Sequence, residues 1–148
     1  MVREIVDELH RDIERSYPEK LLKGCSFSVL TVKQPYASML VSGAKKYEFR
    51  NWKLPEKYIG EWMMIHAGKS VLKTKVKVSD SCYKFFLDYA KEQRLFSCIV
   101  GAVRFGPPEL SDTPFFTGFR WPVQECFSLL SGPIRNIKGH EKIWKITF

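Results

Sequence analysis

The segment that decides the fold spans residues 28–69 and reads SVLTVKQPYASMLVSGAKKYEFRNWKLPEKYIGEWMMIHAGK. Its first residues belong to the apolar, β-branched run Phe27–Val32, which predicts a buried strand. Proline is tolerated in the first turn of a helix, so we expect a short helix over Pro35–Val41. Gly43 is expected to end it, because glycine adopts the left-handed backbone conformation without steric cost.

The next segment, Lys46–Trp52, alternates with the two-residue period of a strand. Tyr47 and Phe49 then point to one side, which we expect to be the core. The opposite face carries an acid, a base and a tryptophan, and we expect it to line a cleft: Glu48, Arg50 and Trp52.

Three more polar side chains are expected beside this charged face: Lys45, His66 and Lys69. Such a cleft binds the phosphates and base edges of a nucleotide, or positions a proton acceptor beside an amine for catalysis. The alternatives are structural, since an exposed salt bridge contributes only about 0–1 kcal/mol and a lone histidine is more often a packed residue than a catalyst. The sequence has no Ser-His-Asp spacing, phosphate-binding glycine loop or metal-ligand cluster, so we expect no metal or cofactor.

Composition indicates one globular domain, because 148 residues with 45% hydrophobic and 14% aromatic side chains are enough for a core. No apolar run is long enough to cross a bilayer, and residues 1–16 are charged where a secretory signal is apolar. We therefore expect an intracellular protein, cytoplasmic or nuclear and not secreted. The four cysteines are widely separated and form no C-x-x-C pair, which favours buried free thiols.

The formal net charge of +8 is concentrated in residues 33–77, which hold ten basic and three acidic side chains, a local excess of +7. A positive field of this kind favours polyanionic partners, either nucleic acid or an anionic surface. The alternative is that the charge only keeps the protein soluble.

The flanking segments supply the remaining elements. Residues 1–24 predict an amphipathic helical extension that covers the domain or binds a partner protein. Residues 70–78 alternate lysine with apolar residues, as on a protected edge strand or a binding face. We expect a core-packing helix from Ser79 to about Arg94, with Cys82, Phe85, Phe86 and Tyr89 on its buried face.

Farther on, residues 96–105 predict a buried strand with Gly101 at a bulge or close approach. The aromatic segment Thr113–Pro122 is interpreted as a loop folded over the core, and the last strands are expected at residues 123–130 and 142–148. Short strands with two or three helices and no βαβ rhythm indicate a small mixed β-barrel of the α+β class.

The residues 43–50, GAKKYEFR, match G-x-K-x-x-E-x-R, the signature of the activating signal cointegrator homology (ASCH) domain. The chain also resembles this family at Gln34-Pro35-Tyr36-Ala37, at Ile65-His66-Ala67 and at residues 137–146, IKGHEKIWKI. The resemblance covers residues 25–148. It implies a PUA-like mixed β-barrel of about five to six strands with two to three flanking helices.

The resemblance further implies binding of RNA or of single-stranded or duplex DNA in a basic cleft, in RNA metabolism or transcription coactivation. We expect Lys33, Lys45, Arg50 and Lys69 to contact phosphates or base edges. Tyr36 and Trp52 would stack on bases, with Glu48 holding Arg50 and His66 on the floor. The expected ligand-binding residues are Lys33, Gln34, Pro35, Tyr36, Lys45, Glu48, Arg50, Trp52, His66 and Lys69.

Some small members of the family are hydrolases, including one that deacetylates acetylated cytidine. The alternative function is therefore hydrolysis of a modified nucleoside or of RNA, with Lys45 and Glu48 as the catalytic pair. That enzyme has a threonine nucleophile where this chain has Glu48, so only the lysine carries over by position. A third hypothesis is a protein-binding adaptor that uses the N-terminal helix.

Overall fold

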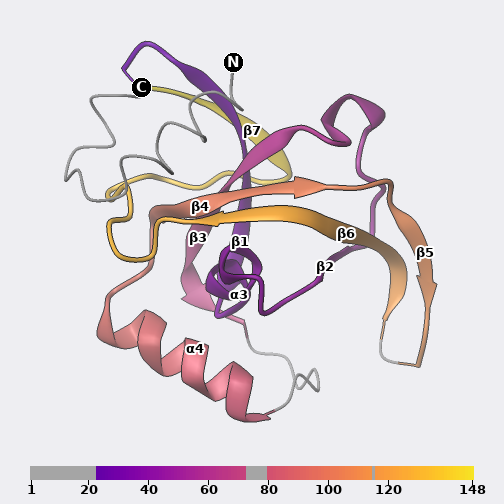
Figure 1. The fold of residues 1–148 in the computed structure, drawn as a ribbon, viewed down its shortest axis with the longest axis horizontal. Coiled ribbons are helices and arrows are strands. Elements are labelled where there is room, and N and C mark those ends of the chain that lie inside the picture. The colour runs from indigo at the N-terminus through magenta and orange to yellow at the C-terminus, as the bar shows by residue number, and fades with distance from the viewer. Residues whose placement is uncertain (1–22, 73–79, 115) are drawn as a thin grey trace.

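The protein was examined as a computed structural model, which describes residues 23–72, 80–114 and 116–148 (Figure 1). Seven strands form one mixed sheet: β1 (Ser26–Gln34), β2 (Tyr47–Arg50), β3 (Trp62–Val71), β4 (Cys98–Phe105), β5 (Glu109–Asp112), β6 (Thr117–Ser128) and β7 (Ile143–Thr147). The helical elements of the described residues are α3 (Tyr36–Ser42), the 3₁₀ turn η1 (Glu56–Tyr58) and α4 (Asp80–Glu92). These elements confirm the α+β class.

The strands follow the order β2-β6-β4-β3-β1-β7, with β5 paired to β6. β1 and β3 are parallel, and every other pairing is antiparallel. In the part of the chain that the structure describes, β2 and β7 stand at opposite ends of this order with no ladder between them. The expected closed barrel is therefore not confirmed, because the sheet curves without closing.

The sheet buries both of its faces along β1. Leu30 and Val32 belong to the core cluster that also contains α3, whereas Phe27 and Val29 belong to a second cluster on the opposite face. A strand that is buried on both sides needs apolar residues at successive positions, which accounts for the unbroken run Phe27–Val32. Figure 1 shows α3 set against the strands, where it contacts β1, β3, β4 and β6.

Two glycines act as the sequence predicts. Gly43 has a φ of 84° and donates its N–H to the Leu40 carbonyl, which ends α3. At Gly101 an added Cβ would lie 2.1 Å from the Phe127 carbonyl oxygen and 2.9 Å from Val41, so no side chain fits. The β3–β4 register shifts beside Gly101, which confirms the expected bulge.

Other expectations were wrong. The segment Thr113–Pro122 is not simply a loop, because β6 already begins at Thr117 and pairs with both β2 and β5. Phe85 was assigned to the core, yet it is 64% exposed on α4, where it stacks on Tyr89. Ala90, near the end of this helix, is the residue that is fully buried.

The cysteine prediction holds in part. All four thiols are free, but Cys98 alone among them is buried, Cys126 is exposed, and Cys25 and Cys82 are half-buried. The described residues contain no helix long and apolar enough to span a membrane. The predicted extension 1–24, apart from its last two residues, and the lysines of residues 73–77 lie outside the described residues.

Candidate functional site

Lys45 lies in the turn between α3 and β2, and its side chain is only 9% exposed. Its Nζ lies 4.8 Å from the ring centroid of Tyr36 and 4.7 Å from that of Phe49. The same amine donates to the Tyr47 carbonyl and lies 3.7 Å from Glu48 Oε1. Burial lowers the pKa of Lys45, and the Glu48 carboxylate partly opposes this shift.

Glu48 is the centre of the motif, and it is almost fully buried at 3% exposure. Its Oε2 accepts hydrogen bonds from Arg50 Nε at 3.1 Å and from Arg50 Nη2 at 2.9 Å. Its Oε1 accepts the backbone N–H of Phe49 at 3.3 Å and faces Lys45. A carboxylate is tolerated at such depth because two cations and a backbone donor replace its hydration.

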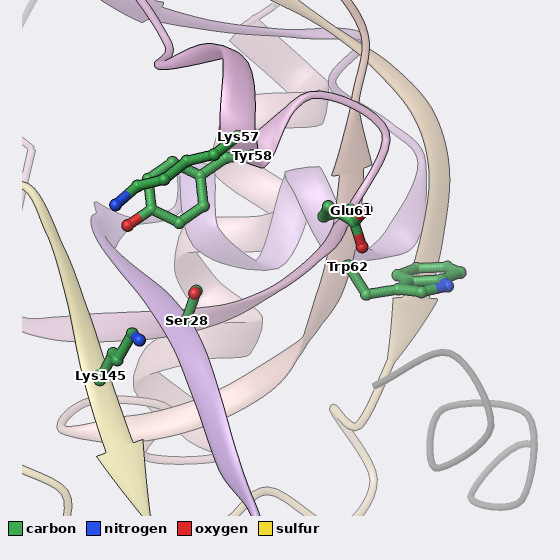
Figure 2. Close-up of a pocket in the computed structure, with 6 residues that line it drawn as sticks. All are labelled: Ser28, Lys57, Tyr58, Glu61, Trp62 and Lys145. Atoms are coloured by element: carbon green, nitrogen blue, oxygen red, sulfur yellow. The ribbon is translucent and has the colours of Figure 1, made fainter. Parts of the chain in front are cut away.

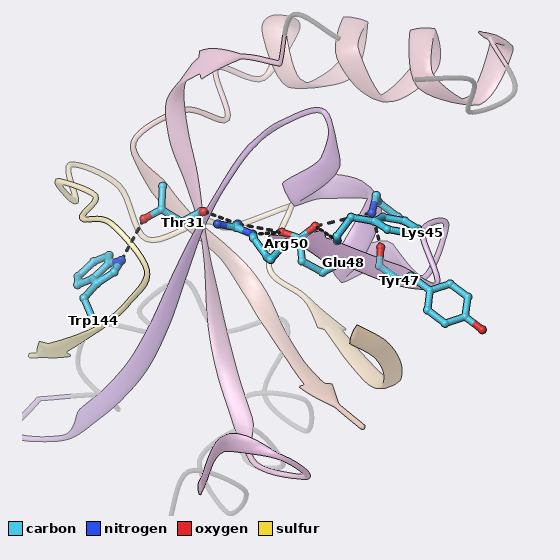
Figure 3. Close-up of polar contacts among 7 residues, drawn as sticks. Thr31, Lys45, Tyr47, Glu48, Arg50 and Trp144 are labelled. Carbon is cyan, nitrogen blue, oxygen red and sulfur yellow. Dashed lines mark hydrogen bonds and ion pairs between the residues drawn. The ribbon is translucent and has the colours of Figure 1, made fainter. Parts of the chain in front are cut away.

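Arg50 links the end strand β2 to β1. Its Nη2 also donates to the Thr31 carbonyl of β1 at 2.9 Å. β7 pairs with β1 only as far as Leu30, so Thr31 is the first β1 residue beyond the ladder and its carbonyl is open to a side-chain donor. A guanidinium from β2 thus bridges to β1 where no backbone pairing occurs, as Figure 3 shows.

The motif also covers the free edge of β2. Val123 N donates to Lys46 O, so by the alternation of an antiparallel ladder Tyr47 and Phe49 turn their backbone polar groups away from β6. The Lys45 amine binds the Tyr47 carbonyl there (Figure 3). The Glu48 carboxylate accepts from the Phe49 N–H. These side chains satisfy an edge that would otherwise pair with another strand.

The expected assignment of the two faces of β2 was wrong. Glu48 faces inward, whereas Phe49 is 40% exposed and packs edge-to-face on Phe116, with ring centroids 5.5 Å apart. Tyr47 is half-buried, with the Arg120 guanidinium 4.8 Å from its ring centroid. The charged face is buried because its charges neutralise one another. The pattern of hydrophobic residues in the sequence does not indicate this kind of burial.

Gln34 and Pro35 are both buried at the junction of β1 and α3. Gln34 Nε2 donates to the Leu95 carbonyl at 2.8 Å, and its Oε1 accepts from Ser38 N at 3.1 Å. Both ends of this amide are therefore used within the protein, where they hold the start of α3 against the segment after α4. Trp52 is half-buried against Trp121, with ring centroids 4.9 Å apart.

His66 is buried at 1% exposure and belongs to a second polar chain. Its Nε2 lies 2.6 Å from the Ile137 carbonyl oxygen, which accepts only, so this nitrogen carries the proton. Its Nδ1 lies 3.2 Å from Thr31 Oγ1, which in turn accepts from Trp144 Nε1 at 3.0 Å. Burial lowers the pKa of His66, and the nearby His140 adds to the shift.

Thr31 joins the two networks, and sequence reasoning missed it. Its carbonyl binds Arg50 and its hydroxyl accepts from Trp144, as Figure 3 shows. The same hydroxyl lies 3.2 Å from His66 Nδ1. A threonine within an apolar strand gives no sequence signal for this role. His66 thus belongs to the packing of residues 137–144 onto the sheet, and it makes no direct contact with Lys45 or Glu48 among the interactions described.

Two exposed lysines lie at the carboxyl ends of the parallel strands. Val32 pairs with Ala67 and Gln34 with Val71, so Lys33 on β1 and Lys69 on β3 lie at neighbouring positions. Lys33 is two residues beyond Thr31, the residue that holds Arg50. Lys33 and Lys69 therefore lie at the same end of the β1–β3 pair, and Lys33 is on the strand whose Thr31 carbonyl holds the 23% exposed Arg50.

A pocket of about 200 Å³ lies elsewhere (Figure 2). None of the ten predicted site residues lines it: its walls are Ser28, Lys57, Tyr58, Glu61, Trp62 and Lys145. The expected cleft around the motif is not confirmed. Within residues 23–72, 80–114 and 116–148, no group of three acidic, histidine or cysteine side chains is arranged to hold a metal.

The fold and the motif together define an α+β domain whose open sheet is bridged by a buried lysine–glutamate–arginine cluster. The sequence model of the ASCH domain matches residues 30–109, more than half of the chain. The chain belongs to the ASCH domain family, which is part of the PUA-like superfamily and is associated with RNA binding. No curated protein matches the chain.

Proposed function

We propose that this chain binds nucleic acid, RNA or DNA, at the surface formed by Lys33, Lys69 and Arg50. The observation that supports the proposal most is the pair of exposed lysines at adjacent strand ends, in a domain whose family is associated with RNA binding. Lysine and arginine side chains on a protein surface neutralise the phosphates of a nucleic acid. The counterions that had condensed on those phosphates are released, which favours binding.

The roles within this surface differ from residue to residue. Lys33 and Lys69 are exposed and have no ion pair described, so their ammonium groups are available to phosphates. Arg50 is partly exposed but already binds Glu48 and Thr31, and its remaining N–H groups bind a phosphate only at the edge of the cluster. Glu48 and Gln34 hold the scaffold and do not read the ligand.

The test is fluorescence anisotropy with mixed-sequence RNA and DNA oligonucleotides over a series of salt concentrations. The wild type should bind, with an affinity that falls steeply as salt rises. The double variant Lys33→Glu/Lys69→Glu should lose most of the binding. The matched control is Lys57→Glu/Lys145→Glu, which makes the same change of charge at the pocket of Figure 2. Absence of binding by the wild type, or an equal loss in both double variants, contradicts the proposal.

A second candidate function, hydrolysis of a modified nucleoside or of RNA, is supported by the lowered pKa of Lys45 beside Glu48. A buried amine of this kind serves as a base or nucleophile once it loses its proton. We would incubate the protein with acetylated cytidine and with RNA and separate the products by chromatography. Turnover that disappears in Lys45→Ala supports this function, and turnover that survives in Lys45→Ala and in Glu48→Ala excludes these two residues.

A further inference from the structure

The outer face of β2 carries aromatic side chains that remain partly exposed. Phe49 is 40% exposed, Tyr47 is half-buried beside it with ring centroids 6.4 Å apart, and Phe116 packs edge-to-face on Phe49. Aromatic rings presented on a sheet surface provide flat apolar faces for other planar groups. The expected role of Tyr47 and Phe49 as core residues leaves this exposure unexplained.

Cations surround these rings. The Lys45 amine and the Arg120 guanidinium lie over the rings of Phe49 and Tyr47, and the exposed Lys46 precedes β2. Lys45 also pairs with the buried Glu48 at 3.7 Å, and Arg120 pairs with Glu109 at 2.7 Å, while Lys46 has no ion pair among the described residues. A purely apolar partner makes no favourable interaction with these cations. A group that combines a planar ring with a phosphate packs its ring on the aromatic side chains and pairs its phosphate with the cations.

We propose that Phe49, with Phe116 and Tyr47 beside it, is a stacking platform for the unpaired bases of a single-stranded nucleic acid. The inference rests on the proposed function and specifies its ligand as single-stranded. Every base has a π-face, so stacking on aromatic side chains is tolerant of sequence, while the backbone follows the positive surface. The bases of a duplex are already stacked on one another and do not reach Phe49.

A strand of nucleic acid bound at Lys33 reaches the platform past Arg50, which bridges β2 to β1. Lys33 is two residues beyond Thr31, whose carbonyl Arg50 binds, and Arg50 is the residue after Phe49 on β2. Because side chains alternate along a strand, Arg50 points toward the interior network and Phe49 points outward. Phosphates held near Arg50 thus leave the attached bases within reach of the outer face.

The experiment compares three RNA probes of about 12 nucleotides, in the range of known single-strand site sizes: a single strand, its duplex, and a single strand with abasic positions. Phe49→Leu keeps an apolar side chain but removes the π-face, and it should weaken binding to the single strand by about tenfold. Binding to the abasic strand should not change. Phe49→Trp should restore the affinity, which a purely structural role of the ring does not explain.

Two further variants keep the result interpretable. Phe85→Leu removes a 64% exposed ring on α4 and should leave every affinity unchanged. Phe116→Leu should weaken single-strand binding in the same direction as Phe49→Leu, and it replaces that variant if Phe49→Leu fails to fold.

The outcomes separate the two proposals. A wild type that binds no probe overturns the nucleic-acid function itself and this inference with it. A wild type that binds while Phe49→Leu and Phe116→Leu match Phe85→Leu overturns the stacking platform alone. If Phe49→Leu changes self-association in sedimentation but not RNA affinity, the aromatic face is a protein interface and the inference is wrong.

Discussion

At the scale of single residues, Glu48 shows how a charged motif serves as scaffold. Its carboxylate is buried and holds Arg50 through two hydrogen bonds, with Lys45 on its other oxygen. A buried carboxylate that loses a partner retains its desolvation cost without the compensating bonds. We therefore expect the signature residues Lys45, Glu48 and Arg50 to stabilise this fold independently of any ligand.

Arg50→Ala should therefore destabilise the protein by about 1–3 kcal/mol, since Glu48 and the Thr31 carbonyl lose donors while Lys45 still shields the carboxylate. Urea denaturation measures the change. The control is Arg120→Ala, whose ion pair with Glu109 is exposed and should contribute no more than about 1 kcal/mol. If both variants are equally stable, the scaffold role of Arg50 is wrong.

The buried imidazole of His66 makes stability depend on pH. Its pKa lies below the ordinary value of 6.5 in the folded protein, because burial disfavours the charged ring. The unfolded chain then takes up a proton at a higher pH than the folded one. The contribution of His66 to stability is complete above 6.5 and is lost as the pH falls from 6.5 toward the folded pKa.

We expect the free energy of unfolding, measured with urea at about pH 7.5 and about pH 5.5, to fall more in the wild type than in His66→Gln. His140→Gln should retain most of the wild-type difference, because His140 acts on the pKa of His66 only through its charge, whereas burial is the largest cause of the shift. A pH dependence that is the same in wild type and His66→Gln would contradict the assignment.

At the scale of elements, the segment that precedes β7 packs on β1 and β3 through a glycine. A Cβ on Gly139 would lie 2.8 Å from His66 Cε1 and 2.9 Å from Thr31 Oγ1, inside the hydrogen-bonded chain that ends at Trp144. The glycine in the IKGHEKIWKI segment is therefore explained by close approach rather than by backbone conformation.

Gly139→Ala should destabilise the protein by about 1–3 kcal/mol, the usual cost of overpacking a filled site. Thermal or urea unfolding checks this value. Gly132→Ala is the matched control, because nothing lies within 4 Å of a Cβ added there. Equal stability of the two variants would show that the contact at His66 relaxes without cost.

The element β2 also revises an expectation about Phe49. If Phe49 occupied a core position, Phe49→Ala would lower the free energy of unfolding by about 3–5 kcal/mol. Because the ring is 40% exposed, we expect a clearly smaller loss of stability than for Trp121→Ala on the neighbouring β6, where the indole is fully buried. Urea denaturation of the two variants decides between the core and the surface positions of Phe49.

At the scale of the whole molecule, the sheet is an open structure held at its two ends by side chains. β2 ends the strand order on one side, and β1 carries β7 on the other. The bond from Arg50 to the Thr31 carbonyl connects β2 to β1 where backbone pairing is absent among the described strands, and Glu48 on β2 holds the Arg50 guanidinium in place. The opening between β2 and β1 is thus closed by polar groups rather than by a ladder.

Chemical labelling of the cysteine thiols reports whether the hydrophobic core of the folded protein stays closed to solvent. Burial raises the pKa of Cys98 to about 11, so its thiol is both inaccessible and protonated at neutral pH. Cys126 is exposed on β6 and should react with a thiol reagent at once, whereas Cys98 should react only as the protein unfolds. Mass spectrometry of a labelling time course checks the order, and rapid labelling of Cys98 would contradict a tightly closed core.

Much of the fold could be predicted from local sequence. Three features depend on the side-chain volume and backbone freedom of individual residues. They are the buried strand at Phe27–Val32, the helix that ends at Gly43 and the bulge at Gly101. The ASCH assignment followed from the spacing of residues 43–50, because that spacing reflects one cluster of charges. These features are properties of short segments.

The direction of β2 was decided by the tertiary structure alone. Alternation identified two faces, but hydrophobicity favoured Tyr47 and Phe49 as the buried pair. The folded protein instead buries Glu48, whose carboxylate is held by Lys45, Arg50 and the Phe49 N–H, all within three residues of it. Burial of this charged cluster, and the bond from Arg50 to the Thr31 carbonyl of β1, depend on how strands distant in the sequence come together, which the linear sequence does not state.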